Sequence, residues 1–202
     1  MRRLRHAPDR LLHRMRRRAA KGALRARPRP RTILVVCHGN ICRSPFAAGL
    51  LSRALAPAGI LVASAGFVGP GRLAPAEGSV AAARRGIDLS DHRSQLLTPV
   101  LAAEAQLIVV MDARQHRMVC ERFGRLPSDV VLLGDLDPDA IETRAIHDPI
   151  DQPLAAFEQS YARIERCVNA LIGALGARHV VPSGPRVTQQ TSGHSLQLRG
   201  RE

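Results

Sequence analysis

Five residues separate Cys37 from Arg43, at a point where a short apolar run gives way to a stretch of helical character. Backbone N–H groups in such a loop and in the first turn of a helix lack partners, and the helix dipole adds positive potential there. A thiolate at this position is stabilised and becomes usable as a nucleophile near neutral pH. The guanidinium of Arg43 offers a planar fork of donors to two oxygens of a tetrahedral oxyanion. The spacing therefore predicts a site at which the Cys37 sulfur attacks a phosphorus atom.

The elements that must position this motif alternate between strand-like and helix-like segments. Short apolar runs predict strands at 33–36, 60–64, 107–111 and 130–133. Helical patterns lie at 44–56, 75–85, 112–123 and 154–175, with Gly86 and Gly176 placed as C-terminal stops. Strands separated by helices pair in parallel through right-handed crossovers, so we expect an α/β fold of three layers (α/β/α) around a central four-stranded parallel sheet. Ligands bind at the carboxyl ends of such strands, where Cys37 falls.

A thiolate that displaces the leaving group of a phosphate monoester needs a carboxylic acid to protonate the departing oxygen. Asp148 is the candidate, in the sequence His147-Asp148-Pro149 between the last strand and the last helix. Pro149 would fix the local backbone and help to aim the carboxyl group. Asp137, which is followed by Pro138, is the alternative, but it comes directly after the fourth strand. We favour Asp148 because of its place before the last helix.

The net charge of +13 is concentrated in an N-terminal arm. Residues 1–31 hold 13 of the 30 Lys and Arg side chains and a single acidic residue, Asp9, so the remaining chain carries a net charge of only +1. We therefore divide the chain into a basic arm at 1–30, disordered or partly helical, an enzymatic domain at 31–178 and a C-terminal tail at 179–202. The Pro, Ser, Gly and Gln content of the tail predicts disorder.

The arm allows three interpretations. Leu11, Met15 and Ala19 recur at four-residue spacing, which favours a helix over 9–26, and the Arg-Pro-Arg-Pro sequence at 27–30 ends it. The arm could precede the true start of translation, for which Met15 is a candidate, or be a solvated extension, or form a surface for anionic lipid or nucleic acid. We favour the first two, and expect no nucleic-acid binding and only weak contact with anionic surfaces.

The cysteines and the apolar runs exclude several classes of protein. Cys37, Cys42, Cys120 and Cys167 show neither the paired spacing of a metal site nor the framework of a secreted disulfide protein. No apolar run approaches the roughly 20 residues that a membrane-spanning helix needs. A thiolate enzyme works best in a reducing compartment, so we expect a cytoplasmic protein without a bound metal.

The motif resembles the signature of the low-molecular-weight protein tyrosine phosphatases, Cys-x-Gly-Asn-x-Cys-Arg-Ser-Pro, and residues 37–45 fill every fixed position. The resemblance covers about residues 31–176. It implies the fold of that family, a phosphocysteine intermediate on Cys37, Asp148 as the acid and later the base, and no metal or other cofactor. The phosphate-binding loop that it implies is made of His38, Gly39, Asn40, Ile41, Cys42 and Ser44, together with Arg43.

The resemblance also implies how this loop is supported and protected. Asn40 would be held by the side chains of Ser44, Ser64 and His92, which keeps the loop N–H groups pointing inward. Asn tolerates left-handed backbone angles, which gives a local reason for its use in so tight a loop. Cys42 would be the redox partner of Cys37, closing reversibly to a disulfide that prevents overoxidation.

The substrate implied by the resemblance is phosphotyrosine in proteins, but the residues around the loop depart from the usual pattern. Ile150 follows Asp-Pro where an aromatic residue is common, and Phe67 is the best remaining candidate for an aromatic wall. His38 stands where an apolar residue is frequent. A phosphoarginine phosphatase of the same fold is an alternative, although those enzymes carry Thr at the position of Ile41.

A thiol-dependent arsenate reductase is a further alternative with the same loop and fold. It would need two more cysteines close together, whereas Cys120 and Cys167 are 47 residues apart on predicted helices. We therefore expect a protein-tyrosine-phosphatase of bacterial type that is a monomer. By analogy with the family, its partners would be phosphotyrosine proteins, including autophosphorylated bacterial tyrosine kinases that control polysaccharide export.

Overall fold

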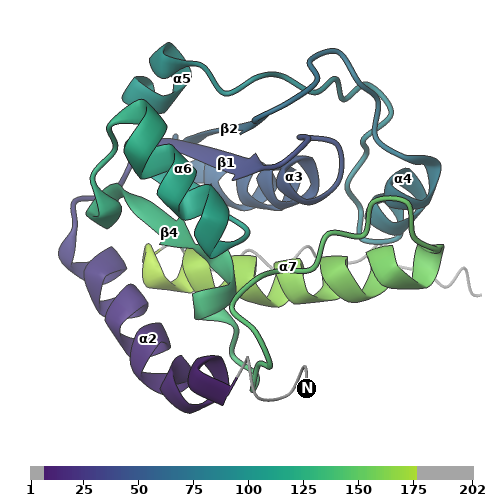
Figure 1. Ribbon diagram of the computed structural model, residues 1–202. Coiled ribbons are helices and arrows are strands. Elements are labelled where there is room, and N and C mark those ends of the chain that lie inside the picture. Colours follow the sequence, from purple (N-terminus) through teal and green to yellow (C-terminus); the bar gives the residue numbers. More distant parts are fainter. Residues whose placement is uncertain (1–6, 177–202) are drawn as a thin grey trace, which may run out of the picture.

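A parallel four-stranded sheet in the order β2-β1-β3-β4 lies between two layers of helices in the computed structural model, which describes residues 7–176 (Figure 1). The strands are β1 (Thr32–Cys37), β2 (Leu61–Gly66), β3 (Leu107–Val110) and β4 (Val130–Leu132). All four strands are within two residues of the predicted bounds. The predicted three-layer α/β/α fold is therefore confirmed. The C-terminal tail predicted at 179–202 lies outside the described residues.

The helices follow the strands in the expected alternation. They are α2 (Ala7–Ala26), α3 (Arg43–Leu55), α4 (Ala76–Ala83), α5 (Pro99–Glu104), α6 (Ala113–Phe123) and α7 (Leu154–Ala174), with 3₁₀ turns η1 (Ala56–Ala58), η2 (Pro127–Asp129) and η3 (Leu133–Leu136). Gly86 and Gly176 have φ of 71°, so both take the left-handed conformation that ends a helix. The short α5, capped by Thr98, was not predicted because its six residues are too few for a helical period to show.

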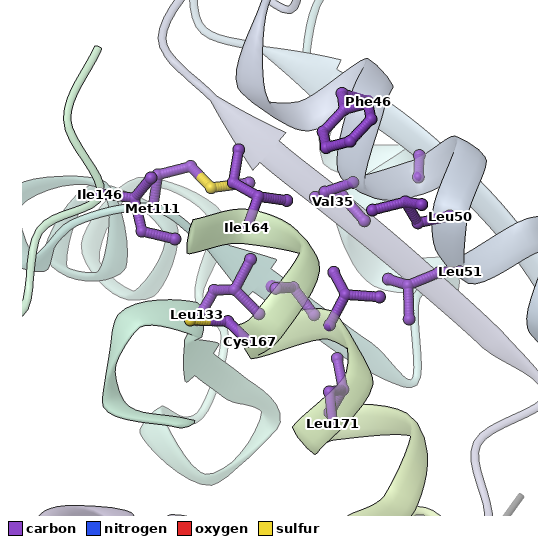
Figure 2. Packing of buried hydrophobic residues seen from close by; sticks show 14 of the residues in the cluster. Val35, Phe46, Leu50, Leu51, Met111, Leu133, Ile146, Ile164, Cys167 and Leu171 are labelled. Carbon is purple, nitrogen blue, oxygen red and sulfur yellow. The ribbon is translucent and has the colours of Figure 1, made fainter. Parts of the chain in front are cut away.

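Alternate residues of β1 face two separate cores. Val35 packs with α3 and α7, as Figure 2 shows beside Phe46, Leu51 and Ile164. Val36, from the other side of the same strand, joins the smaller cluster under α5 and α6. Both side chains are fully buried. Because helices press on β1 from both sides, the end of the strand, and Cys37 with it, has a fixed position in the molecule.

Helix α2 packs against the rest of the protein. The side that it buries is opposite to Leu11, Met15 and Ala19, whose spacing predicted the helix. Its ring nitrogen His13 Nε2 donates to the Asp137 carbonyl at 3.0 Å, and Leu24 is buried against the main core. Leu11 and Met15 are 81% and 67% exposed. The arm therefore takes the helical alternative over residues 7–26, and the helix is docked rather than detached. Among the helices of residues 7–176, none has both the length and the apolar character needed to cross a membrane.

Candidate active site

The loop from Cys37 to Arg43 closes at the carboxyl end of β1 and leads directly into α3. Cys37 is paired in register with Gly66 of β2, so the loop is held beside the end of a neighbouring strand. Ser44, in the first turn of α3, points its Oγ at Cys37 Sγ at 3.0 Å. A hydroxyl so placed donates a hydrogen bond to the sulfur. The predicted strand, loop and helix therefore bring the thiol to a helix N-terminus, as anion binding requires.

Arg43 is 3% exposed and has its guanidinium fixed from two directions. One terminal nitrogen donates to the Ile146 carbonyl at 3.1 Å, and the other donates to Asp148 Oδ2 in an ion pair. Its buried Nε has no hydrogen-bond partner among the described residues. A buried N–H of a cation without an acceptor is costly, and an oxygen of a bound oxyanion would supply one.

Asn40 is the centre of the network that holds the loop. Its φ of 51° is in the left-handed region, which Asn tolerates better than most residues. Its Nδ2 donates to Ser44 Oγ and to Ser64 Oγ, each at 2.9 Å. His92 Nε2 donates to the Asn40 carbonyl at 2.6 Å. The structure thus brings together the three residues that were expected around Asn40, from α3, β2 and the segment after α4.

Two further contacts of the loop were not predicted. The backbone N–H of Gln95 donates to Asn40 Oδ1 at 2.9 Å, and the Gln95 side chain donates to the Ser64 carbonyl at 2.6 Å. The hydroxyl of Tyr161 donates to the Cys42 carbonyl at 3.1 Å, while its ring stacks on Phe46 with centroids 4.1 Å apart. Tyr161 is the one tyrosine of the chain, and no sequence pattern indicated its role. Nothing in the sequence around Gln95 pointed to the loop.

Gly66 leaves room for the backbone of the loop. A Cβ atom added there would lie 2.8 Å from the Asn40 nitrogen and 2.8 Å from the His38 carbonyl oxygen, which are both backbone atoms. The N–H of the next residue, Phe67, donates to the same His38 carbonyl at 2.8 Å. The loop and the end of β2 are therefore in direct backbone contact, and only glycine fits between them.

We expect Gly66→Ala to lower kcat by at least roughly 10-fold, because the loop must shift to admit the methyl group and its N–H groups then lose their aim. Gly173→Ala in α7 is the matched control, since a Cβ there meets nothing within 4 Å. Steady-state hydrolysis of p-nitrophenyl phosphate by both variants measures the effect. An unchanged kcat for Gly66→Ala would show that the loop tolerates this displacement.

The two candidate acids have different surroundings. Asp148 faces Arg43, and its side chain is 34% exposed. Asp137 is buried and forms ion pairs with Arg163 at 2.9 Å and Arg166 at 3.3 Å on α7. The alternative acid is thus enclosed by two guanidinium groups away from Cys37, and Asp148 is the carboxylate next to the loop.

The segment that carries Asp148 is fixed by hydrogen bonds to α7 and within itself. Ser160 Oγ donates to the His147 carbonyl at 2.9 Å. Gln152 Nε2 donates to the Asp148 carbonyl at 3.2 Å. These bonds hold the backbone on both sides of the carboxyl group. The Asp148 carboxylate is held by Arg43 through Oδ2, and its other oxygen accepts only a long bond of 3.4 Å from the Ile150 N–H.

A cavity of about 370 Å³ opens beside Arg43 and Asp148. Its apolar lining comes from Phe67, Met118 and Ile146, and its polar lining includes His38. Ile150 is half-buried and packs against the main core. Phe67 therefore takes the position expected for an aromatic wall. Met118 on α6 adds a second apolar surface that the sequence did not indicate.

None of the remaining cysteines replaces Cys37 as the nucleophile, and Cys120 and Cys167 do not form the pair that a disulfide relay needs. Burial raises the pKa of the Cys42 thiol to about 12, with the Asp148 charge as a smaller cause, so this thiol keeps its proton at neutral pH. Burial likewise raises the pKa of Cys167 to about 12. Cys167 belongs to the core on the α7 side of the sheet and Cys120 to the α6 side. Since the sheet separates them, they cannot form the adjacent pair that an arsenate reductase needs.

Among residues 7–176 no cluster of His, Cys, Asp or Glu could hold a metal ion.

A family model and two similar proteins all describe low molecular weight protein-tyrosine-phosphatases. The family model described as low molecular weight phosphotyrosine protein phosphatase matches residues 32–181. The chain is 41% identical over 151 residues to a probable low molecular weight protein-tyrosine-phosphatase, EpsP, of Ralstonia nicotianae, which covers 73% of this chain and 97% of that protein. It is 38% identical over 153 residues to the low molecular weight protein-tyrosine-phosphatase Wzb of Salmonella typhi, covering 74% of this chain and 97% of Wzb.

Solved structures with the same fold include two kinds of phosphatase. The tyrosine phosphatase AmsI of Erwinia amylovora matches with a TM-score of 0.65 and 32% identity over 72% of this chain and 93% of AmsI. The YwlE arginine phosphatase of Geobacillus stearothermophilus matches with a TM-score of 0.65 and 30% identity over 73% of this chain and 94% of YwlE. The overall fold therefore does not separate the two substrate classes, and the residues around the loop must do so.

Proposed function

The chain belongs to the low molecular weight phosphotyrosine protein phosphatase family, and we propose that it hydrolyses phosphotyrosine in proteins through a phosphocysteine intermediate on Cys37. One observation carries the mechanism. The buried guanidinium of Arg43 pairs with the carboxylate of Asp148, and the neighbouring Ser44 donates to the sulfur of Cys37 at the carboxyl end of β1, so residues 37, 43 and 148 belong to one site. A nucleophile, an oxyanion clamp and a proton donor in one place suffice for phosphoryl transfer without a metal.

In the first step, the Cys37 sulfur attacks phosphorus and the P–O bond to the tyrosine ring breaks. Asp148, in its protonated form, gives its proton to the departing phenolate oxygen. Arg43 and the loop N–H groups bind the three remaining phosphoryl oxygens, and they stabilise the charge spread over these oxygens in the transition state. Binding of the phosphoryl group to Arg43 also replaces the ion pair with Asp148, which frees this carboxyl group to turn toward the leaving group.

In the second step, the ionised Asp148 takes a proton from water. The water oxygen attacks phosphorus, the P–S bond breaks, and inorganic phosphate and the Cys37 thiolate are released. Ser44 Oγ, 3.0 Å from the sulfur, donates to the thiolate as it departs. The support of Asn40 by Ser64 and His92 keeps the loop in one shape through both steps. We also propose that Cys42 is the redox partner of Cys37. When a peroxide oxidises the Cys37 thiolate to a sulfenic acid, the Cys42 thiol attacks that sulfur, water leaves and the Cys37–Cys42 disulfide forms.

The cavity favours an aromatic ester as the substrate. A phenyl ring bound between Phe67 and Met118 would bury apolar surface on both faces. A phosphoarginine guanidinium would place polar N–H groups against the same apolar side chains, and the Asp112 carboxylate in the lining already accepts from Gln115 with both oxygens. This difference supports phosphotyrosine over phosphoarginine, although the fold is common to both kinds of enzyme.

The function is tested with three peptides of one sequence that carry phosphotyrosine, phosphoserine or phosphoarginine at the same position. We expect kcat/KM for phosphotyrosine to exceed that for the other two by at least roughly 10-fold, since apolar contacts of this kind are worth about 1–3 kcal/mol. Phosphate release measures all three reactions. Faster hydrolysis of the phosphoarginine peptide would assign the chain to the other substrate class.

For the setting of the reaction we propose the bacterial cytoplasm, with an autophosphorylated tyrosine kinase as a partner and the phosphatase acting as a monomer. The support is the bacterial origin of the relatives and the need of a catalytic thiol for reducing conditions.

A further inference from the structure

The outward side of α2 has a composition that the phosphatase chemistry does not use. Figure 1 shows α2 at the periphery of the molecule, beside α7 and away from the loop that follows β1. Its inward side is fixed by His13, which donates to the Asp137 carbonyl, and by Leu24, which is buried in the main core. Asp9 Oδ2 adds a contact by accepting from the Arg144 N–H at 3.2 Å. Because α2 is docked in this way, its outward side is held in a constant orientation on the enzyme.

One half of this outward side is apolar. Leu11 is 81% exposed, Met15 is 67% exposed and Leu12 is 37% exposed. Leu11, Met15 and the exposed Ala19 are four residues apart, so they form a strip along the helix axis. Large apolar side chains this exposed on a helix that is itself docked have no packing role in the described structure.

The other half of the outward side is cationic. Five basic side chains line a hollow along the helix together with Gly22: Arg14, Arg17, Arg18, Lys21 and Arg25. The helix contains one acidic residue, Asp9, and its carboxylate is already engaged by Arg16 at 2.8 Å and by the Arg144 N–H. The charge is local, since the chain beyond residue 31 has a net charge of only +1.

We propose that α2 binds the surface of an anionic phospholipid bilayer and that this holds the phosphatase at the membrane. The helix lies parallel to the surface over a length of about 30 Å. The strip of Leu11 and Met15 enters the boundary between headgroups and acyl chains, and the basic strip contacts the phosphates of anionic lipids. A basic strip beside an apolar strip is the arrangement that an interfacial helix needs, and it goes beyond the weak contact with anionic surfaces expected from charge alone.

The apolar strip favours a bilayer over a nucleic acid. Both offer phosphates to arginine, but the grooves and backbone of a nucleic acid provide no apolar layer for Leu11 and Met15. In a bilayer the same two side chains leave water, which is favourable in proportion to the apolar area they expose. The outward side of α2 also contributes no residue to the cavity beside Arg43, so membrane binding leaves the active site open.

The test is flotation of the full-length protein with vesicles of phosphatidylcholine alone and of phosphatidylcholine with 30% phosphatidylglycerol. We expect binding to the anionic vesicles, weaker binding to the neutral ones, and partial release in high salt. The double variants Leu11→Ser/Met15→Ser and Arg14→Glu/Arg18→Glu should each lower the bound fraction at least 5-fold at limiting lipid. All variants should hydrolyse p-nitrophenyl phosphate at the wild-type rate in solution, which shows that they are folded.

Matched controls come from exposed residues elsewhere on the chain. Val100→Ser/Leu126→Ser removes two side chains that are 64% and 65% exposed, and Arg117→Glu/Arg122→Glu makes the same change in charge on α6. Both should bind vesicles like the wild type. The proposal is overturned if wild type does not bind anionic vesicles, or if Leu11→Ser/Met15→Ser binds them undiminished. It is also overturned if a duplex oligonucleotide binds more tightly than the vesicles. None of these results bears on the phosphatase activity itself.

Discussion

Replacement of Cys37 by Ser should abolish turnover, with a fall in kcat of at least roughly 10³-fold, because a serine hydroxyl in place of the sulfur is not ionised near neutral pH. The change removes one nucleophilic atom and keeps the size of the side chain, so the loop, Arg43 and Asp148 stay in place. Binding of a phosphotyrosine peptide should therefore persist. The measurements are steady-state hydrolysis of p-nitrophenyl phosphate and calorimetric binding of the peptide to Cys37→Ser.

Two other cysteines provide controls for this result. Cys120→Ser, on the far side of the sheet from the α7 core, should leave kcat unchanged. Cys42→Ser should stay active within about 10-fold, since burial raises the pKa of this thiol to about 12 and it is not the nucleophile. If Cys37→Ser kept substantial activity while Cys42→Ser lost it, the nucleophile would be Cys42. Loss of peptide binding by Cys37→Ser would instead point to a collapsed loop, and that variant would then be uninformative about the chemistry without a test of its stability.

Replacement of Asp148 by Asn should lower kcat by about 10²-fold for substrates with a poor leaving group, because Asn cannot protonate the departing oxygen. The loss should be smaller for p-nitrophenyl phosphate, since p-nitrophenolate leaves readily without a proton. The comparison of phenyl phosphate with p-nitrophenyl phosphate therefore isolates the acid role. An equal loss with both substrates would indicate that Asp148 acts mainly in the hydrolysis of the intermediate.

Asp137→Asn is the matched control, because it makes the same chemical change at the alternative Asp-Pro sequence. Asp137 is buried between Arg163 and Arg166, so the neutral amide leaves Arg163 without a counter-charge, while Arg166 keeps its ion pair with Asp139 at 2.9 Å. We expect the free energy of unfolding in urea to fall by about 2 kcal/mol, while kcat of the folded enzyme changes little. Asp148→Asn should show the reverse pattern, with a large loss of kcat and little change in stability. A large loss of kcat in Asp137→Asn alone would show that Asp137 is the general acid and that Asp148 is not.

The local part of the site could be predicted from the sequence. Cys37, Arg43 and Ser44 lie within eight consecutive residues, so a strand that ends and a helix that begins are enough to place them together. The strands and the longer helices were also predicted. Buried strands appear as short apolar runs, and helices that cover a sheet repeat apolar residues at helical spacing. The short α5 left no such period to detect.

The rest depended on contacts between distant segments. Asp148 could be preferred to Asp137 only by its order in the chain, and the tertiary structure separates them physically by placing one beside Arg43 and the other between arginines of α7. Gln95 and Tyr161 support the loop from 55 and 119 residues away through a backbone N–H and a hydroxyl. Neither donor has a pattern that a sequence would reveal.

Helix α2 shows the same division between local and distant determinants. The four-residue spacing of Leu11, Met15 and Ala19 is a local property, and it predicted a helix correctly. Which side of the helix would be buried was decided by its partners, because His13 meets the Asp137 carbonyl and Leu24 meets the core. The sequence by itself determined the catalytic motif and the secondary structure, since both follow from neighbouring residues. Only the tertiary structure decided which distant groups complete the site and which surface of the arm stays free, because those choices depend on contacts across the folded chain.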